Sequence, residues 1–405
     1  MAAASPPLCG LTPDQLLRAV ALSHWRTALY FGGTAWTVIA LDALVPMRAG
    51  AVMARIGERI SGKKWVQGLA VAPLWLLILT AIGLPLTVLG HHVSLEYGLS
   101  VEPWAAWWSD FGKSAALTVG VGTLVLSVLY ALMRRAPRRW WLWFWVFTVP
   151  VVVLGTFLEP LVIDPLFNHF TPLAQSDPAL VAQLERVADR GGLRIPPSRI
   201  YLMDASRKVT GPNAYVTGIG ASKRIVVWDT TLQVESPNEI LFTYGHEQGH
   251  YVLHHIPKGI AFSAVVIFIF YWIGFRLLRR LVQGHGPRWG IESVDSWTSL
   301  GLVLLLLTVL SFLAEPVGNA FSRQIEHQAD VYGQEVIHGL VPDPQAAAVS
   351  SFCADARVWL DDPNPNPFVV FWTYSHPTTE QRAEFAARYN PWLPGREPRY
   401  FTKQN

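Results

Sequence analysis

His246, Glu247 and His250 form the pattern His-Glu-x-x-His, and their chemistry is the clearest in this chain of 405 residues. Residues four apart share one face of a helix, so both histidines can bind one metal ion while Glu247 stands beside a water on that ion. Hydrolytic zinc sites use such imidazole ligands and keep one position open for water. The pattern predicts a zinc peptidase in which Glu247 takes a proton from the attacking water and passes it to the leaving amine.

The segment before this motif has the features of a helix start. Ser236 suits the N-cap, Pro237 the first helical position, and Glu239 stands three residues after the cap, so we expect a helix from residue 236. The same motif could also be two solvated histidines on a polar helix face. The apolar neighbours Leu241 and Tyr244 make this less favourable, because burying imidazole and carboxylate groups without a partner is costly. A metal ion would be such a partner.

A third protein ligand is expected from a second helix. Glu326 and Asp330 are four residues apart in the segment 319–330, so both carboxylates point the same way. Glu326 would bind zinc, and Asp330 would accept the free ring N–H of a ligand histidine. As an alternative, Arg323 and these two acids could form ion pairs on a surface helix. The presence of the His-Glu-x-x-His motif favours the ligand interpretation.

His376 is a further candidate, in a stretch that follows the Pro- and Asn-rich segment 361–367. A histidine before a proline is commonly a turn residue. A zinc peptidase, however, also needs a donor opposite the metal to hold the oxyanion of the tetrahedral intermediate. We take His376 as the candidate for this role.

The elements that must position these residues lie in a membrane protein. Hydrophobic residues make up 51% of the chain and charged residues only 15%, whereas about a quarter of a soluble domain is charged. Six apolar stretches approach the roughly 20 residues that cross a bilayer as a helix; the last two are the shortest and could instead be buried helices of a soluble domain. The stretches are 27–45, 65–89, 114–133, 140–158, 259–275 and 297–314. The expected fold is a mainly α-helical multi-pass membrane protein.

The chain divides into four parts. Residues 1–160 form a membrane unit with four spans, and 161–256 form a peptidase lobe with the motif helix. In this lobe, Asp177-Pro178 opens an amphipathic helix, and three short apolar runs between 199 and 228 predict a small antiparallel sheet. Residues 257–315 form spans five and six, and 316–405 complete the lobe. Because two spans separate the ligand helices, the zinc must lie where the lobe meets the membrane.

Composition also excludes some functions. The net charge of +3 and the lack of a basic, aromatic patch give no support for nucleic-acid binding. Cys9 and Cys353 are too few for a disulfide framework and lie far from the zinc motif in the sequence, so we interpret both as structural or incidental.

Six segments taken together resemble the family of the type I CAAX prenyl protease, a family of membrane zinc peptidases. They are 165–172, 212–218, 223–230, 246–255, 319–330 and 375–382, and they cover most of residues 160–385. The resemblance implies a ring of transmembrane helices around a large water-filled chamber, with one zinc ion per chain at its wall. Gln248 departs from the Leu that is usual in the family, at a position that need not touch zinc.

The resemblance also implies roles for individual residues. His246, His250 and Glu326 would be the zinc ligands, Glu247 the general base, and Asp330 the partner of a ligand histidine. His376 and Arg382 would lie near the oxyanion. The strand with Asn213, Ala214 and Tyr215 would hold the substrate backbone by adding it to the edge of the sheet.

The expected partners are the lipid bilayer and a peptide or protein substrate, with or without an attached lipid. The excess of Arg over Lys is typical of a GC-rich bacterial genome, so we expect a bacterial inner membrane. Because bacteria generally lack prenylation, a prenylated substrate is in doubt. The alternatives are a quality-control peptidase of the HtpX heat-shock type, which normally has fewer spans, and a membrane scaffold that binds zinc without catalysis.

Two patterns disagree on which side of the membrane the lobe lies. The short connections 47–64, 134–139 and 276–288 are rich in Arg and Lys, whereas 90–112 has none. Basic connections stay in the cytoplasm, which would place the lobe outside. The resemblance implies a lobe in the cytosol, and we favour it here because long polar domains weaken the charge rule.

Overall fold

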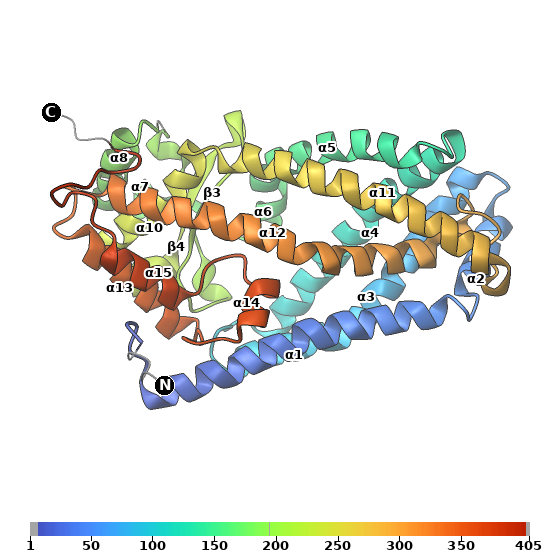
Figure 1. Cartoon of the computed structure of the whole chain (residues 1–405), viewed down its shortest axis with the longest axis horizontal. Coiled ribbons are helices and arrows are strands. Elements are labelled where there is room, and N and C mark those ends of the chain that lie inside the picture. Colours follow the sequence, from blue (N-terminus) through green and yellow to red (C-terminus); the bar gives the residue numbers. More distant parts are fainter. Residues whose placement is uncertain (1–6, 194, 402–405) are drawn as a thin grey trace.

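The computed structural model describes residues 7–193 and 195–401, and it is mainly helical (Figure 1). Five helices are long and apolar enough to cross a membrane, and α1 and α2, which meet at a bend of 66°, together make a sixth candidate span. The described residues thus agree with the six spans expected from the sequence. The membrane helices are α1 (Pro13–Leu44), α2 (Ala49–Ile60), α3 (Lys64–Glu96), α4 (Trp104–Arg135), α5 (Trp140–Leu158), α11 (His255–Trp289) and α12 (Leu300–Val336).

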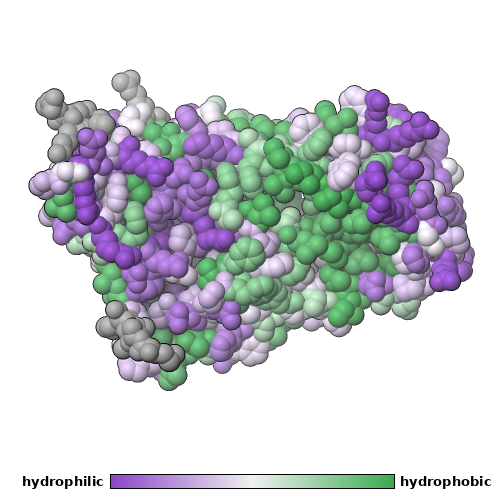
Figure 2. All heavy atoms as spheres, in the orientation of Figure 1, coloured by the Kyte–Doolittle hydropathy of each residue, from purple (hydrophilic) through white to green (hydrophobic). Residues whose placement is uncertain are grey.

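The spans form a closed ring. Each helix contacts the next in the order α1, α3, α4, α5, α11 and α12, and α12 returns to α1. Figure 2 shows the result on the surface: apolar side chains cover the middle of the molecule, and hydrophilic side chains gather at both ends. An apolar band between polar ends is what a bilayer requires of a spanning protein.

The peptidase lobe lies at the end of the ring where both chain termini are found (Figure 1). Its longer helices are α8 (Pro178–Arg190), α10 (Pro237–Val252), α13 (Pro344–Val358) and α15 (Thr379–Arg388). Shorter helices are α6 (Asp164–Phe167), α7 (Leu173–Ser176), α9 (Asp229–Val234) and α14 (Pro367–Thr373), and single turns of other helix types lie at Glu159–Ile163, Pro197–Arg199, Ala205–Arg207, Gly220–Ser222 and Trp297–Ser299. As expected, α8 begins at Asp177, whose side chain accepts a hydrogen bond of 2.8 Å from the Leu180 backbone N–H.

The sheet differs from the expected antiparallel arrangement. Four strands, β1 (Phe170–Pro172), β2 (Ile200–Met203), β3 (Ala214–Thr217) and β4 (Arg224–Trp228), lie in the order β1-β2-β4-β3. The pairs β1–β2 and β3–β4 are antiparallel, but β2 and β4 are parallel. The prediction was wrong here because the chain leaves β2, runs to the far edge to form β3, and only then returns to fill the gap with β4. This order makes β3 an edge strand beside α10.

Two features tie the lobe to the ring. Helix α12 runs without interruption through residue 315, so one helix carries both a membrane span and Glu326. The second feature is a disulfide between Cys9 and Cys353, with the two Cα atoms 4.8 Å apart. The sequence analysis left these cysteines as structural or incidental, and the bond shows that they are structural: they pair because Leu8 and Cys9 lie against α15 of the lobe, beside α13.

The ligand helices α10 and α12 cross at glycines. A Cβ added at Gly333 would lie 2.8 Å from the backbone nitrogen of His246, and one added at Gly245 would lie 2.7 Å from the Val336 side chain and 3.2 Å from the Gly333 carbonyl. Real Cβ atoms do not approach backbone atoms so closely. Only glycine on both helices permits this distance between the backbones.

We predict that Gly333→Ala pushes α10 away from α12. The clash is with backbone rather than with a flexible side chain, so the expected cost is about 1–3 kcal/mol, with a lower melting temperature in detergent and weaker metal retention. Gly318→Ala on the same helix is the matched control, because an added Cβ there meets nothing within 4 Å. Equal melting temperatures and metal contents for the two variants would contradict this account of the crossing.

Candidate active site

The motif helix begins where the sequence predicts. Ser236 precedes α10, and its backbone N–H donates a 2.6 Å hydrogen bond to the Glu239 carboxylate, which completes a capping box. His246 and His250 follow inside the helix, one turn apart, on the face that packs against α12. The cap therefore sets the start of the helix, and the helical period sets the direction of both imidazoles.

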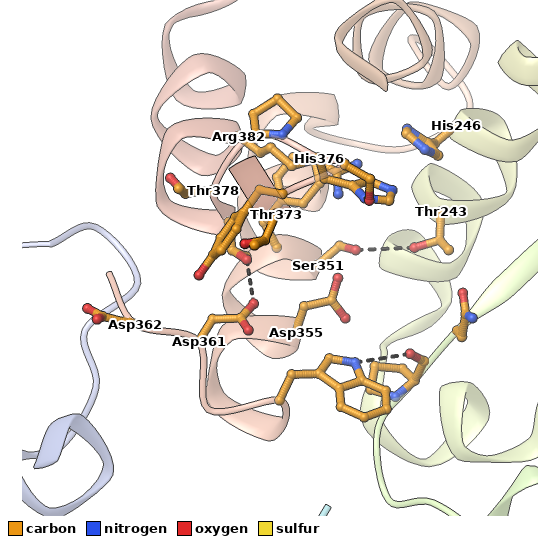
Figure 3. Close-up of a pocket in the computed structure, with 18 of the residues that line it drawn as sticks. Thr243, His246, Ser351, Asp355, Asp361, Asp362, Thr373, His376, Thr378 and Arg382 are labelled. Carbon is orange, nitrogen blue, oxygen red and sulfur yellow. Dashed lines mark hydrogen bonds between the residues drawn. The ribbon is translucent and has the colours of Figure 1, made fainter. Parts of the chain in front are cut away.

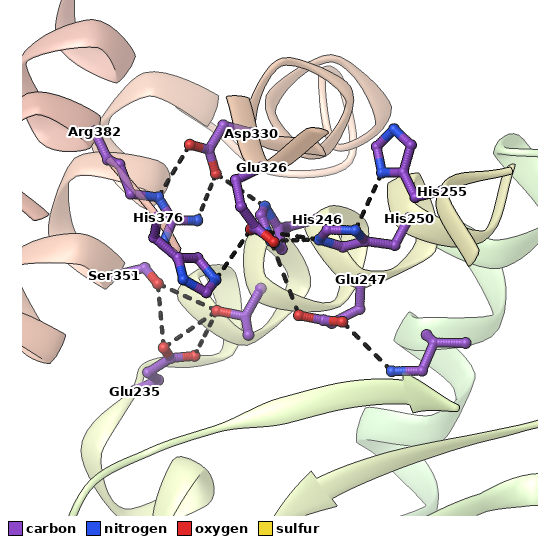
Figure 4. Close-up of polar contacts among 12 residues, drawn as sticks. Glu235, His246, Glu247, His250, His255, Glu326, Asp330, Ser351, His376 and Arg382 are labelled. Atoms are coloured by element: carbon purple, nitrogen blue, oxygen red, sulfur yellow. Dashed lines mark hydrogen bonds and ion pairs between the residues drawn. The ribbon is translucent and has the colours of Figure 1, made fainter. Parts of the chain in front are cut away.

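Both imidazoles meet Glu326 of α12 (Figure 4). The Nε2 atoms of His246 and His250 are 3.1 Å apart. The Oε2 atom of Glu326 lies 3.2 Å from the first and 3.5 Å from the second. Glu247 also belongs to this group, since its carboxylate and the two ring nitrogens fall within 4.8 Å of one another. Its distance of 3.9 Å from His246 Nε2 is longer, so the geometry favours Glu326 as the third ligand.

The donor set fits a metal cation. The Glu326 carboxylate is 7% exposed, and its Oε2 atom makes no hydrogen bond to any residue that the structure describes, although ring nitrogens surround it. Burial alone would raise the pKa of Glu326, but the contacts with His246, His250 and His376 lower it well below its usual range. An ionised, buried oxygen that faces two imidazole nitrogens is the environment that a divalent cation completes.

A series of charged side chains, each in contact with the next, orients His246. The Nδ1 atom of His246 lies 2.9 Å from Asp330 Oδ1, and Asp330 in turn accepts hydrogen bonds of 3.0 and 2.6 Å from the Arg382 guanidinium. Burial would raise the pKa of Asp330, but the charge of Arg382 and the contact with His246 hold it far below its ordinary value. Asp330 is therefore an acceptor that turns the His246 Nε2 atom toward Glu326.

His250 has a support that the sequence analysis missed. His255 Nδ1 lies 3.1 Å from His250 Nδ1, and His255 Nε2 lies 3.3 Å from the Gln328 side-chain oxygen. One tautomer satisfies the whole series: His250 donates to His255, and His255 donates to Gln328, which leaves His250 Nε2 free for a ligand. His255 stands beyond the end of α10, after His254 with a φ of 57°, so helical spacing gave no signal for it.

His376 reaches the same place from the other side. Its Nε2 atom lies 3.2 Å from Glu326 Oε2, its Nδ1 atom lies 2.9 Å from Ser375 Oγ, and its side chain is 51% exposed. Arg323 holds this loop by donating to the Tyr374 and Val370 carbonyl oxygens. Arg323 is therefore occupied with backbone carbonyls rather than with the surface ion pairs of the alternative interpretation.

The predicted substrate strand lies next to the motif. The backbone N–H of Val216 on β3 donates a 3.4 Å hydrogen bond to Glu247. Asn213 and Ala214 line the cavity at the site, whereas the Tyr215 side chain turns away, with its hydroxyl donating to Asp164 at 3.1 Å. The structure thus brings the edge of β3 to Glu247 but does not bring the tyrosine ring there.

A cavity of about 660 Å³ opens at these residues, between α1, β3, α10, α13 and α15. Figure 3 shows Asp355 and Arg382 among the side chains on its wall. Burial raises the pKa of Glu235 to about 8, although Thr243 and Ser351 donate hydrogen bonds to it. Burial also raises the pKa of Asp355, to about 7. The cavity therefore holds two carboxyl groups that resist ionisation, and nothing in the sequence pattern had singled them out.

Two family models match the chain. Residues 174–389 match Peptidase family M48. The chain belongs to this peptidase family. Residues 18–169 match the model described as CAAX prenyl protease N-terminal, five membrane helices, and this segment contains most of α1 and the whole of α2 to α5. The protein is a membrane metallopeptidase of the CAAX prenyl protease 1 type, which confirms the family and the activity expected from the sequence.

Individual proteins show the same relationship. A Bacillus subtilis protein named Uncharacterized metalloprotease YhfN is 34% identical, over 94% of this chain and 88% of its own length. CAAX prenyl protease 1 of Saccharomyces cerevisiae is 29% identical, over 75% of this chain and 68% of its own. The crystal structure of S. mikatae Ste24p superposes with a TM-score of 0.80 at 22% identity, over 96% and 93% of the two chains. The last similarity confirms the fold.

We predict that Asp355→Asn stabilises this M48 peptidase, and more so at high pH. The folded-state pKa of about 7 lies above the ordinary value of 3.8, so the folded state binds the proton more tightly than the unfolded state does. The cost of ionising Asp355 therefore grows as the pH rises from about 4 and is complete above about 7, where it is on the order of 4 kcal/mol. Melting curves at pH 5.5 and 8.5 measure it. A smaller gain at the higher pH would contradict the sign.

Proposed function

We propose that this protein is a zinc metalloendopeptidase that holds one Zn²⁺ per chain through His246, His250 and Glu326. The observation that carries the proposal is the meeting of both Nε2 atoms with Glu326 Oε2, at 3.2 and 3.5 Å. Two imidazoles and one carboxylate are a donor set that suits zinc and leaves a position for water. When bound, zinc would lower the pKa of that water and polarise the scissile carbonyl.

Glu247 acts as the general base in this proposal. Its carboxylate lies beside the ligand group, 3.9 Å from His246 Nε2, and the hydrogen bond from Val216 fixes its direction. From this position Glu247 removes a proton from the attacking water and returns it to the leaving nitrogen. No second acid is needed, because the Glu247 carboxylate both accepts the proton from the water and donates it to the leaving nitrogen.

His376 supplies the donor for the oxyanion. It is the half-exposed imidazole at the mouth of the site, 3.2 Å from Glu326, so it can turn its N–H toward a carbonyl that stands in the cavity. Arg382 has a different part: its two hydrogen bonds hold Asp330, and Asp330 holds His246. Arg382 and Asp330 are thus positioning residues for a ligand.

The substrate binds as an added strand at the edge of β3. The Trp228 backbone N–H donates to the Asn213 carbonyl at 3.0 Å, so Asn213 and Tyr215 turn their backbone groups inward to β4, and Ala214 and Val216 turn theirs outward. The outward groups of Ala214 and the outward carbonyl of Val216, with Asn213 at the cavity, can pair with an extended peptide, while the Val216 N–H stays on Glu247. Its scissile bond would then lie beside Glu247.

The proposal extends to the membrane in which the protein lies and to the substrate that it cleaves. We assign the protein to a bacterial inner membrane, as the Bacillus relative and the high arginine content suggest. The yeast relative carries the name CAAX prenyl protease 1. We propose that the present protein cleaves protein substrates without a prenyl group, because the Bacillus relative indicates a bacterial host and bacteria generally lack prenylation.

We predict that Glu247→Gln keeps zinc but loses cleavage. The amide is the same size and cannot take a proton, so turnover should fall by a factor of about 10²–10⁴ or more. The assay measures zinc content and hydrolysis of one unfolded peptide, offered with and without a prenyl group. Glu384→Gln, on an exposed turn of α15, is the control. Retained turnover in Glu247→Gln would remove the residue from the reaction, and a loss of zinc would make it a ligand.

We predict that His376→Ala lowers kcat with little effect on KM or zinc content. The imidazole acts on charge that develops only in the transition state, so the expected loss is about 10²–10³-fold in kcat. His327→Ala, whose ring packs on Phe385 instead, is the control. A rise in KM at an unchanged kcat would show that His376 binds the ground state and not the oxyanion.

A further inference from the structure

We infer that the active site opens on the side of the membrane opposite the cytoplasm, in a compartment that oxidises thiols, and that its substrates are polypeptide segments exposed there. This inference rests on the proposed function for the cleavage itself and adds the compartment in which it takes place. Two independent observations carry it: a buried disulfide in the lobe, and the basic residues at the far end of the ring.

The disulfide belongs to the lobe. Cys9, just before the cap of α1, is 3% exposed, and Cys353 on α13 is 6% exposed, and both lie in the apolar core of the lobe. The Glu380 carboxylate on α15 accepts hydrogen bonds from the backbone N–H groups of Leu8 and Cys9. Leu8 and Cys9 are therefore part of the lobe, and the bond lies on the same side of the membrane as the metal site.

A buried disulfide identifies the compartment. Such bonds persist where thiols are oxidised and are rare in a reducing cytosol. Forming this one takes two thiols to a disulfide and releases two protons, while two electrons reduce the disulfide of a thiol oxidase protein to a dithiol. Since the chain has only these two cysteines, no third thiol of its own can reopen the bond. The bond is structural rather than catalytic.

The opposite end of the ring is basic. The last turn of α4 holds Arg134 and Arg135, and the connection to α5 adds Arg138 and Arg139. The stretch 45–63, which follows the bend after α1 and contains the short helix α2, and the last turns of α11 add more Arg and Lys than acidic residues. All three connections are short, which is the condition under which positive charge keeps a connection in the cytoplasm.

The lobe end lacks this pattern. The connection 97–103 between α3 and α4 has no Lys or Arg. Arg18 and Arg26, on the part of α1 nearest the lobe, are exposed, and they donate to the backbone carbonyls of Tyr97 and Trp359. The charge difference between the two ends therefore places the basic end in the cytoplasm and the lobe outside.

The two observations are separate in origin. One is a covalent bond in the lobe, and the other is charge at the other end of helices of 32 to 37 residues, which is about 50 Å away. Both place the metal site outside, against the cytosolic arrangement that we favoured from the family resemblance. Substrates would then be exported proteins, or the outer segments of membrane proteins, rather than chains modified in the cytosol.

Cysteine labelling in intact cells tests the inference. Gly62→Cys lies in the basic connection, where an added Cβ meets nothing within 4 Å, and Glu397→Cys lies on the exposed surface of the lobe. We expect a membrane-impermeant maleimide added to intact cells to label Glu397→Cys and not Gly62→Cys, with both labelled after permeabilisation. Labelling of Gly62→Cys alone would overturn the inference.

Thiol trapping of the unaltered protein gives a second readout. After cells are quenched in acid, the denatured chain should react with a polyethylene-glycol maleimide only after reduction, and then by two additions. Cys353→Ser should show one free thiol without reduction. Two free thiols in the unaltered chain would contradict the oxidising compartment. If the labelling or the trapping result contradicts the inference, the purified enzyme should still cleave peptides. If the proposed function is wrong, the purified, zinc-loaded protein should cleave no peptide.

Discussion

The close crossing of α10 and α12 is the constraint on which the rest of this protein depends. Gly245 and Gly333 let the two backbones approach so closely that a Cβ on either would meet the other helix within 2.7 to 2.8 Å. At this separation the Glu326 side chain reaches both His246 and His250, which stand one turn apart on α10. If the two helices crossed at a larger distance, Glu326 would lose its contacts with the two histidines, because none of the three side chains is long enough to span the wider gap.

Charged side chains can be buried at this crossing because each of them contacts a partner. His246 and Asp330 are buried and Arg382 is half-buried, and each contacts the next. Removing any member would leave a buried ion without its partner, which costs far more than the pair contributes when intact. The same series orients the imidazole, so the arrangement that makes burial possible also prepares the site for a cation. His255 and Gln328 do this for the second imidazole without any charge.

The ring of membrane helices and the lobe are joined at more than one place. Helix α12 carries a membrane span at one end and Glu326 at the other, and α11 begins at His255, five residues after His250. The Cys9–Cys353 disulfide closes the opposite side by joining the start of α1 to α13. The metal site is thus held between two membrane helices and a lobe that α12 and the disulfide join to them.

The sequence by itself determined the parts that depend on local spacing. The period of a helix put His246 with His250 and Glu326 with Asp330, and the length of the apolar stretches predicted six spans, because both follow from residues that are near one another in the chain. Only the tertiary structure decided the parallel pairing of β2 with β4, the Cys9–Cys353 bond and the support of His250 by His255 and Gln328. These join residues that are far apart in the chain or out of helical phase. Their contacts come from the way whole elements pack, for which local periodicity carries no signal.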